Sequence, residues 1–210
     1  NGLFEPQFDV LGPVTLSGTQ AYYGENKGSN DARPHMMAIE GCRLLDKDVD
    51  FSKYDNDGDG VIDNVFIFFA GEAESSTGVA DQVWPHTGFV SYKSSVPEIF
   101  DGVRLDRYAC SNEWTEPHPG EPGVGRPDGI GTFVHEFSHV MGLPDLYATV
   151  YNKAFTPGRW STLDYGPYNN DGCTPPNYSV FERYALGWLQ PRELTGASNV
   201  RLEEISRNQA

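Results

Sequence analysis

The alternation of hydrophobic and polar positions divides the chain into a few regular elements joined by long polar loops. From 31 to 46, apolar residues recur at helical spacing behind Pro34, which predicts an amphipathic helix. Residues 61–70 form a nearly unbroken apolar run, which predicts a buried, central strand of a sheet. Shorter apolar runs predict further strands at 8–11, 13–16, 82–84, 88–92 and 103–110.

A second amphipathic helix is predicted over residues 131–141. At about 100° per residue, its apolar side chains gather on one side, and His135 and His139 fall on the opposite side. Gly142 follows the last periodic residue, where a left-handed residue ends a helix, and Pro144 prevents its continuation. The chain must therefore turn sharply after this helix.

The remaining segments are less regular. Residues 113–131 are rich in proline and glycine and predict a loop, whereas residues 178–186 have the spacing of a short helix that ends at Gly187. Residues 191–210 alternate weakly and predict a strand that leads toward a further domain. No repeat or low-complexity tract breaks this order, and 210 residues suffice for one substantial core, so we expect one domain.

The spacing of the two histidines indicates a metal site. Residues four apart on a helix lie one turn above each other, so His135 and His139 can direct their rings at one zinc ion. The turn after the helix brings Asp145 back as a third ligand and leaves a fourth position for water. Glu136 is not needed as a ligand and is placed to take a proton from that water, whose pKa zinc lowers to about 7.

The opposing interpretation of this helix is a surface element with two solvated histidines. We favour the metal site because two of only five histidines stand at ligand spacing, with the glutamate and the glycine exit in register. The other histidines, His35, His86 and His118, are isolated and are interpreted as loop or packing residues.

An acidic loop precedes the predicted central strand and indicates a calcium site. Calcium takes six to eight oxygen ligands, and Gly60 permits the tight bend that such a loop needs. The twelfth position is Phe66 and no helix follows, so the loop is not an EF-hand. An acidic, solvated turn without an ion is the alternative. The predicted ligands are Asp55, Asp57, Asp59, the Val61 carbonyl and Asp63.

The charge and the apolar runs limit the classes of partner. Thirty acidic against fifteen basic residues give a net charge of −15, so no basic surface is expected for nucleic acids or anionic membranes. No apolar run reaches the roughly twenty residues of a membrane helix. Because the chain begins at Asn1, we expect a processed piece whose signal peptide and propeptide are not present.

The cysteines allow at most one intrachain disulfide. Cys42, Cys110 and Cys173 have no CxxC spacing, and the sequence cannot choose among their three pairings. Because Cys42 falls inside a predicted helix, we prefer a bridge between Cys110 and Cys173. Three buried thiols are the alternative.

The string HEFSHVMGLPD, from His135 to Asp145, resembles the zinc motif of the metzincin metallopeptidases. Together with the acidic DGDGVID string and the later ERYALGWL string, it resembles the secreted bacterial immune inhibitor A-type metallopeptidases over nearly the whole chain. The resemblance implies zinc endopeptidase activity on proteins, synthesis as a secreted zymogen, structural calcium, and further domains after the catalytic one.

One departure from the family pattern lies in the turn expected beneath the metal. Where the family's turn resembles WSxMDYG, residues 160–166 read WSTLDYG, so Leu163 stands in place of methionine. Both side chains are apolar and of similar volume, and such a swap usually costs less than about 1.5 kcal/mol in a core. Tyr165 matches the tyrosine that approaches the metal or the oxyanion in some metzincins, and its phenol is a candidate donor to the developing negative charge. One more packed tyrosine is the alternative.

The resemblance completes the expected architecture. We predict an α/β (α+β) fold with a twisted, mostly parallel sheet and two long helices in an upper lobe of about residues 1–142. An irregular lower lobe of about 143–190 follows, with the active-site cleft between the lobes. The catalytic domain is thus predicted over 1–190, with 191–210 as a C-terminal extension.

The leading hypothesis is a secreted, monomeric zinc endopeptidase that acts on proteins or peptides. Its metal ligands are His135, His139 and Asp145, and its catalytic residues are Glu136 and Tyr165. A calcium-stabilised binding or adhesion module on a weakened peptidase fold is the alternative, with Leu163 as its sign. A zinc hydrolase of another bond, such as a glycan amide, has the same ligands.

Overall fold

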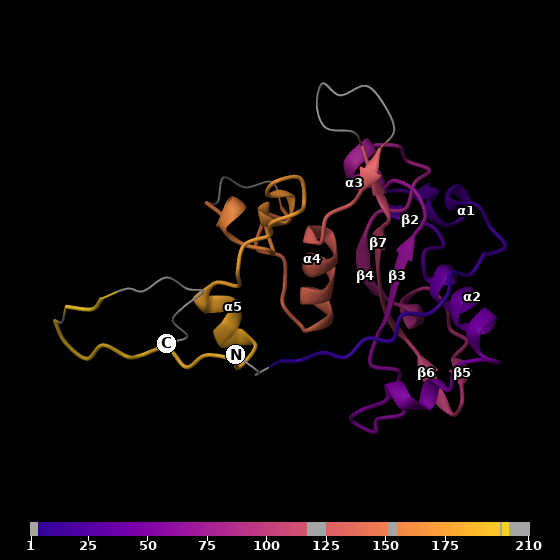
Figure 1. The fold of residues 1–210 in the computed structure, drawn as a ribbon, viewed down its shortest axis with the longest axis horizontal. Coiled ribbons are helices and arrows are strands. Elements are labelled where there is room, and N and C mark those ends of the chain that lie inside the picture. Colours follow the sequence, from indigo (N-terminus) through magenta and orange to yellow (C-terminus); the bar gives the residue numbers. More distant parts are fainter. Residues whose placement is uncertain (1–3, 117–124, 151–154, 198, 202–210) are drawn as a thin grey trace. The chain divides into compact units, whose positions relative to one another are not determined.

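The computed structural model describes residues 4–116, 125–150, 155–197 and 199–201 (Figure 1). The chain forms two compact units, one of Gln7–Asp128 and the other of Gly129–Ala210 joined by Asn1–Pro6. Both helices and strands are present, so the fold is mixed α and β, as predicted. His118 lies outside the described residues.

The first unit is built on a three-stranded sheet. Its order is β3 (Val65–Phe69), β7 (Arg107–Asn112) and β4 (His86–Phe89), with β3 parallel and β4 antiparallel to β7. The prediction of a mostly parallel sheet is therefore wrong, because one of its two strand pairs is antiparallel.

The central strand of this sheet is β7 and not the apolar run of residues 61–70. Strand β7 is buried over residues 108–112, whereas β3 lies at one edge of the sheet and its Phe68 side chain is 61% exposed. The run also begins as a loop: Val61 forms an isolated bridge with Arg104, and the strand starts only at Val65. The run is apolar on both faces, yet only one face meets the core of this unit.

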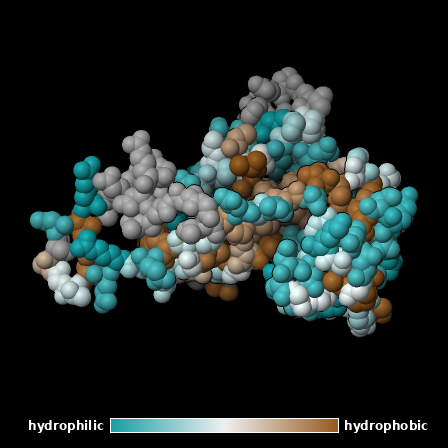
Figure 2. Space-filling view, turned by 60° about the horizontal axis from the view of Figure 1, so that its bottom comes forward, coloured by the Kyte–Doolittle hydropathy of each residue, from teal (hydrophilic) through white to brown (hydrophobic). Residues whose placement is uncertain are grey.

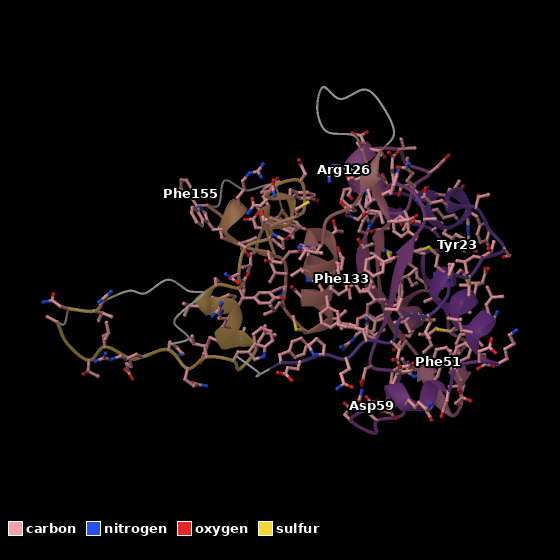
Figure 3. All side chains as sticks on the ribbon, in the orientation of Figure 1. Tyr23, Phe51, Asp59, Arg126, Phe133 and Phe155 are labelled. Carbon is pink, nitrogen blue, oxygen red and sulfur yellow. The ribbon has the colours of Figure 1, made fainter. Side chains whose placement is uncertain are left out.

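Helix α2 (His35–Leu45) lies beside the sheet and supplies much of the core (Figure 1). It begins directly after Pro34 and matches the predicted helix to within a few residues. Its inner side chains pack with those of β3, β6 and β7, and Phe51 and Tyr23 mark the two hydrophobic clusters (Figure 3). The first cluster is Ala38, Ile39, Cys42, Phe51, Ile62, Val90, Phe100, Val103, Leu105 and Tyr108.

Short elements complete the first unit. They are α1 (Gln20–Gly24), α3 (Glu74–Thr77), η1 (Phe51–Tyr54) and η2 (Val90–Tyr92), and three two-stranded ribbons, each antiparallel. The ribbons pair β1 (Asn26–Lys27) with β2 (Asn30–Asp31), β5 (Glu98–Phe100) with β6 (Val103–Leu105), and β8 (Trp114–Thr115) with β9 (Arg126–Pro127).

Several predicted strands are absent or displaced. Residues 8–11 and 13–16 form no strand and are mostly exposed, because Pro13 lacks a donor and these apolar side chains meet little of the core. No strand forms at 82–84, and the strand predicted at 88–92 lies at His86–Phe89. The run 103–110 is broken at Asp106, whose carboxylate accepts hydrogen bonds from the Ser91 amide (2.9 Å) and from Arg104 (2.6 Å).

Within its described residues, the second unit contains two helices and two short 3₁₀ turns. These are α4 (Gly131–Val140), α5 (Val180–Ala185), η3 (Gly158–Trp160) and η4 (Gly166–Tyr168). Helices α4 and α5 confirm the predicted helices at 131–141 and 178–186. The strand predicted at 191–210 is absent from the described residues 191–197 and 199–201.

All three cysteines are free thiols. The preferred bridge between Cys110 and Cys173 is therefore wrong. The alternative of three buried thiols holds for Cys42 and Cys110 but not for Cys173, which is exposed. Burial raises the pKa of the Cys42 thiol to about 12.

The surface agrees with the composition. Hydrophilic residues cover much of the face seen in Figure 2, as expected for a net charge of −15. Among the described residues, no helix has the length and apolar character needed to cross a membrane.

His86, interpreted as a packing residue, contacts the Tyr108 hydroxyl (2.8 Å) and the Trp84 carbonyl (2.7 Å).

Candidate metal centre

Helix α4 holds two histidines on one face. The helix can begin close to η4 because Gly131 lacks a side chain: an added Cβ would lie 2.0 Å from the Pro167 carbonyl oxygen. On its apolar face, Phe133 stacks on Phe137, and Phe137 also contacts Phe4. This packing fixes the rotation of the helix and leaves His135 and His139 with their rings 4.7 Å apart.

The turn after α4 returns the chain toward the histidines. Gly142 adopts a left-handed conformation with φ of +95°, as predicted, and its amide donates to the His139 carbonyl at 2.9 Å. The Leu143 amide donates to the Ser138 carbonyl at 3.0 Å, and the Leu143 side chain is buried. This closed turn delivers Asp145 to the two imidazoles.

Three ligand atoms converge on one point. His135 Nε2 lies 3.2 Å from His139 Nε2, and Asp145 Oδ1 lies 3.4 Å from the first nitrogen and 3.1 Å from the second. A tetrahedral zinc ion, with bonds of about 2.0–2.1 Å, places its ligand atoms about 3.3–3.4 Å apart. Asp145 Oδ1 is buried and accepts no hydrogen bond of good geometry from the described residues. The three residues thus fit a single metal ion.

Backbone carbonyls orient both imidazoles. His135 Nδ1 lies 2.8 Å from the Thr162 carbonyl oxygen, and His139 Nδ1 lies 2.7 Å from the Leu143 carbonyl oxygen. A carbonyl only accepts, so each Nδ1 carries the proton and each Nε2 presents its lone pair toward the shared point. This is the tautomer that a metal ligand needs.

The same three groups interact electrostatically in the metal-free protein. Burial lowers the pKa of His139, but contacts with Asp145, the Leu143 carbonyl and the charge of Glu136 outweigh it and raise the pKa to about 8. The pKa of His135 is raised in the same way. Burial would raise the pKa of Asp145, yet the two histidines and the Tyr147 hydroxyl together hold it below its usual range. A cation is therefore favoured at this point.

The turn that contains Leu163 is held from beneath by α5. Ser161 Oγ donates to Glu182 Oε1 at 2.6 Å, and the Leu163 amide donates to Ser161 Oγ at 3.0 Å. The other Glu182 oxygen accepts from the Ser179 amide, which closes a capping box at the start of α5. Glu182, Thr162 and Leu163 are completely buried. The Thr162 carbonyl that orients His135 therefore belongs to a well-anchored turn.

The sequence reasoning missed these supporting residues. Glu182 and Ser161 are 21 positions apart, so no local pattern links them. Tyr147, which helps to lower the pKa of Asp145, stands two positions after the aspartate, and this closeness in sequence was an available signal. Of the two predicted catalytic residues, Glu136 is buried and Tyr165 is 61% exposed.

The acidic loop of the first unit brings together three of the four carboxylates predicted as ligands. Carboxylate oxygens of Asp55, Asp57 and Asp59 all lie within 4.8 Å of one another, on the loop that enters β3 (Figure 3). Gly60 has φ of +81°, as the predicted bend requires. The Asp63 carboxylate instead accepts a hydrogen bond from Asn56.

One helix carries two histidines one turn apart with a glutamate between them, and an aspartate follows the glycine turn. This arrangement is that of a metallopeptidase. A family model described as immune inhibitor A peptidase M6, catalytic domain, matches residues 3–193. The chain therefore belongs to this peptidase family.

Individual relatives agree with the family assignment. The pre-pro-metalloprotease PrtV of Vibrio cholerae is 28% identical over 95% of this chain and 23% of its own length. Immune inhibitor A of Bacillus thuringiensis is 27% identical over 79% of this chain and 27% of its own length. A putative secreted metallopeptidase of Arthroderma benhamiae is 30% identical over 55% of this chain. The chain thus spans about a quarter of the length of the first two relatives.

Proposed function

We propose that the chain is the catalytic part of a secreted, zinc-dependent endopeptidase that cleaves peptide bonds in proteins. The observation that carries the proposal is the triangle of His135 Nε2, His139 Nε2 and Asp145 Oδ1, with sides of 3.1–3.4 Å. Membership of the peptidase family supports the same reaction class. We further propose that it acts as a monomer. The Vibrio relative is named a pre-pro-metalloprotease, and we propose that this protein is likewise made with pre- and pro-segments.

In this mechanism, His135, His139 and Asp145 hold the metal. Zinc supplies a Lewis acid and a water of lowered pKa when it is bound. Glu136, next to His135 on α4, takes the proton of the attacking water and passes it to the amine that leaves. Tyr165 donates a hydrogen bond to the carbonyl oxygen of the substrate as negative charge develops there.

Removal and return of zinc test this proposal. The protein stripped by a chelator is expected to lose casein cleavage, and one equivalent of zinc per chain is expected to restore it, because three ligands bind one ion. The measurement is zinc content together with digestion of casein and of a peptide library. Full cleavage by protein free of metal would contradict the proposal. An adhesion module would instead keep its binding to a target after chelation.

We also propose that the acidic loop binds calcium through Asp55, Asp57 and Asp59, with Val61 and Asp63 completing the site. The support is the convergence of three carboxylates within 4.8 Å on one loop, since calcium binds through oxygen ligands. At a calcium concentration one hundred times Kd, binding is expected to stabilise the metal-stripped protein by about 2.7 kcal/mol. The melting temperature is therefore expected to rise when calcium is added.

The matched control for calcium is Asp57→Asn, which keeps the size of the side chain and removes one charge. The melting temperature of this variant is expected to rise less when calcium is added. For the wild-type protein, the same concentration of magnesium is expected to raise it less than calcium, because magnesium prefers octahedral sites with water. Equal melting of the wild-type protein with and without calcium would contradict an occupied loop.

A further inference from the structure

A buried serine on α4 joins this helix to the segment that leads into α5. Ser138 is completely buried, and its hydroxyl donates to the Val134 carbonyl, one turn earlier on the same helix, at 2.6 Å. Its oxygen also lies 2.6 Å from the Tyr178 hydroxyl oxygen. A serine hydroxyl carries one hydrogen and a carbonyl only accepts, so the Tyr178 hydroxyl donates to Ser138. The tyrosine thus holds α4 through a hydrogen bond of defined direction.

This hydrogen bond lies on the flank of the helix, beside the two histidines. At about 100° per residue, Ser138 lies about 60° from His135 and about 100° from His139 around the helix axis. The stacked rings of Phe133 and Phe137 lie on the opposite side. Aromatic packing accepts a range of ring distances and angles, whereas a hydrogen bond weakens steeply as it bends. The hydrogen bond therefore defines the rotation of the histidine face more narrowly than the aromatic packing does.

The start of α5 also anchors the turn that orients His135. Tyr178 immediately precedes the capping box of α5, whose Glu182 carboxylate accepts from the Ser161 hydroxyl at 2.6 Å. The next residue in that turn is Thr162, whose carbonyl oxygen lies 2.8 Å from His135 Nδ1. One capped turn thus holds both the helix that carries His135 and the carbonyl that orients its ring.

The Tyr178 ring is itself held in place. The Trp188 ring meets it edge-on, with ring centroids 5.6 Å apart. Arg183 Nε donates to the Tyr178 carbonyl at 3.0 Å, which fixes the backbone at the same point. Because ring and backbone are both fixed, the hydroxyl offers Ser138 a donor at a fixed position.

We propose that Tyr178 is a positioning residue of the metal centre, which fixes the rotation of α4 through Ser138 and so holds both histidine rings at the shared ligand point. The role rests on the zinc site proposed above. Groups that contact a metal ligand directly typically contribute about 10–100-fold to metal affinity. Tyr178 acts through the helix and not on a ligand, so we expect an effect at the lower end of this range.

Zinc affinity of Tyr178→Phe tests the proposal. The stripped protein is titrated with zinc against a chromophoric chelator, and Kd is expected to rise about 10-fold relative to wild type. In the metal-free protein, the ring-nitrogen NMR resonances of His135 are expected to shift, because rotation of α4 changes the distance from Nδ1 to the Thr162 carbonyl. Tyr184→Phe removes the same hydroxyl from a side chain of α5 that is 52% exposed, and it is expected to change neither measurement.

A double-mutant cycle shows whether the effect passes through the hydrogen bond. Ser138→Ala is expected to weaken zinc binding by a similar factor. The double variant is expected to bind no more weakly than either single variant, because either substitution already removes the bond. Multiplied effects in the double variant overturn the proposal. Unchanged zinc binding and unchanged histidine resonances in Tyr178→Phe also overturn it.

Ser179→Ala separates positioning from a general loss of stability. It removes the side-chain cap of α5 but keeps the Tyr178 hydroxyl, so the melting temperature is expected to fall while the zinc Kd stays at the wild-type value. Equal weakening of zinc binding by Ser179→Ala and Tyr178→Phe would overturn the proposal. If the wild-type protein binds no zinc, the proposed function itself fails, and the histidine resonances of the metal-free protein still decide whether Tyr178 positions the rings.

Discussion

Glu136→Gln is expected to lower the rate of peptide hydrolysis by roughly 10²–10⁴-fold and to leave zinc bound. Glutamine has nearly the same shape, so it fills the same buried position on α4. It cannot accept the proton of the attacking water, and a general base usually contributes a factor of this size. The measurement is kcat/KM on a fluorogenic peptide, with zinc content determined on the same samples.

A control separates the chemistry from the fold in this experiment. The metal triangle does not include Glu136, so the variant is expected to keep the zinc stoichiometry of the wild type and a similar melting temperature. If the variant cleaves casein at the wild-type rate, Glu136 is not the base. If it loses zinc, the residue acts on the metal site and not on the water.

Glu182→Ala is expected to destabilise the protein by about 3–5 kcal/mol. The carboxyl group is completely buried and accepts hydrogen bonds from the Ser161 hydroxyl and the Ser179 amide. Alanine leaves both donors without this partner, at about 1–3 kcal/mol each, and opens a cavity. For a chain of this size, about 2–4 °C is lost per kcal/mol, so the melting temperature is expected to fall by roughly 6–20 °C.

Ser179→Ala is the control for this variant. It removes the side-chain cap of α5 but keeps the bond between Ser161 and Glu182, so only about 1 kcal/mol is expected to be lost. Scanning calorimetry of both variants compares the two losses. Equal and small effects would show that the buried carboxyl group is not an anchor of the turn.

The sequence predicted best those features whose partners are close together in the chain. Helices α2 and α4 follow from the spacing of their apolar residues, and the three candidate ligands fall within eleven positions. The order of the sheet was predicted wrongly, because residues 65–69 pair with residues 108–112, and no local pattern encodes that partner.

The supporting residues of the metal centre show the same limit. Thr162 lies 27 positions from the His135 ring that it orients, and the Ser161–Glu182 bond spans 21 positions. Tyr147 was within reach of sequence reasoning, since it stands two positions beyond a candidate ligand. The acidic loop was only partly predicted, because Asn56 provides a local partner for Asp63.

The leucine in the turn whose Thr162 carbonyl contacts His135 has a chemical consequence. Leu163 is completely buried, in the position where the related motif carries methionine. A methionine there can be oxidised to a sulfoxide, which turns an apolar side chain into a polar one and disrupts its packing. Leucine has no sulfur to oxidise, so peroxide cannot damage the packing of this turn by this route.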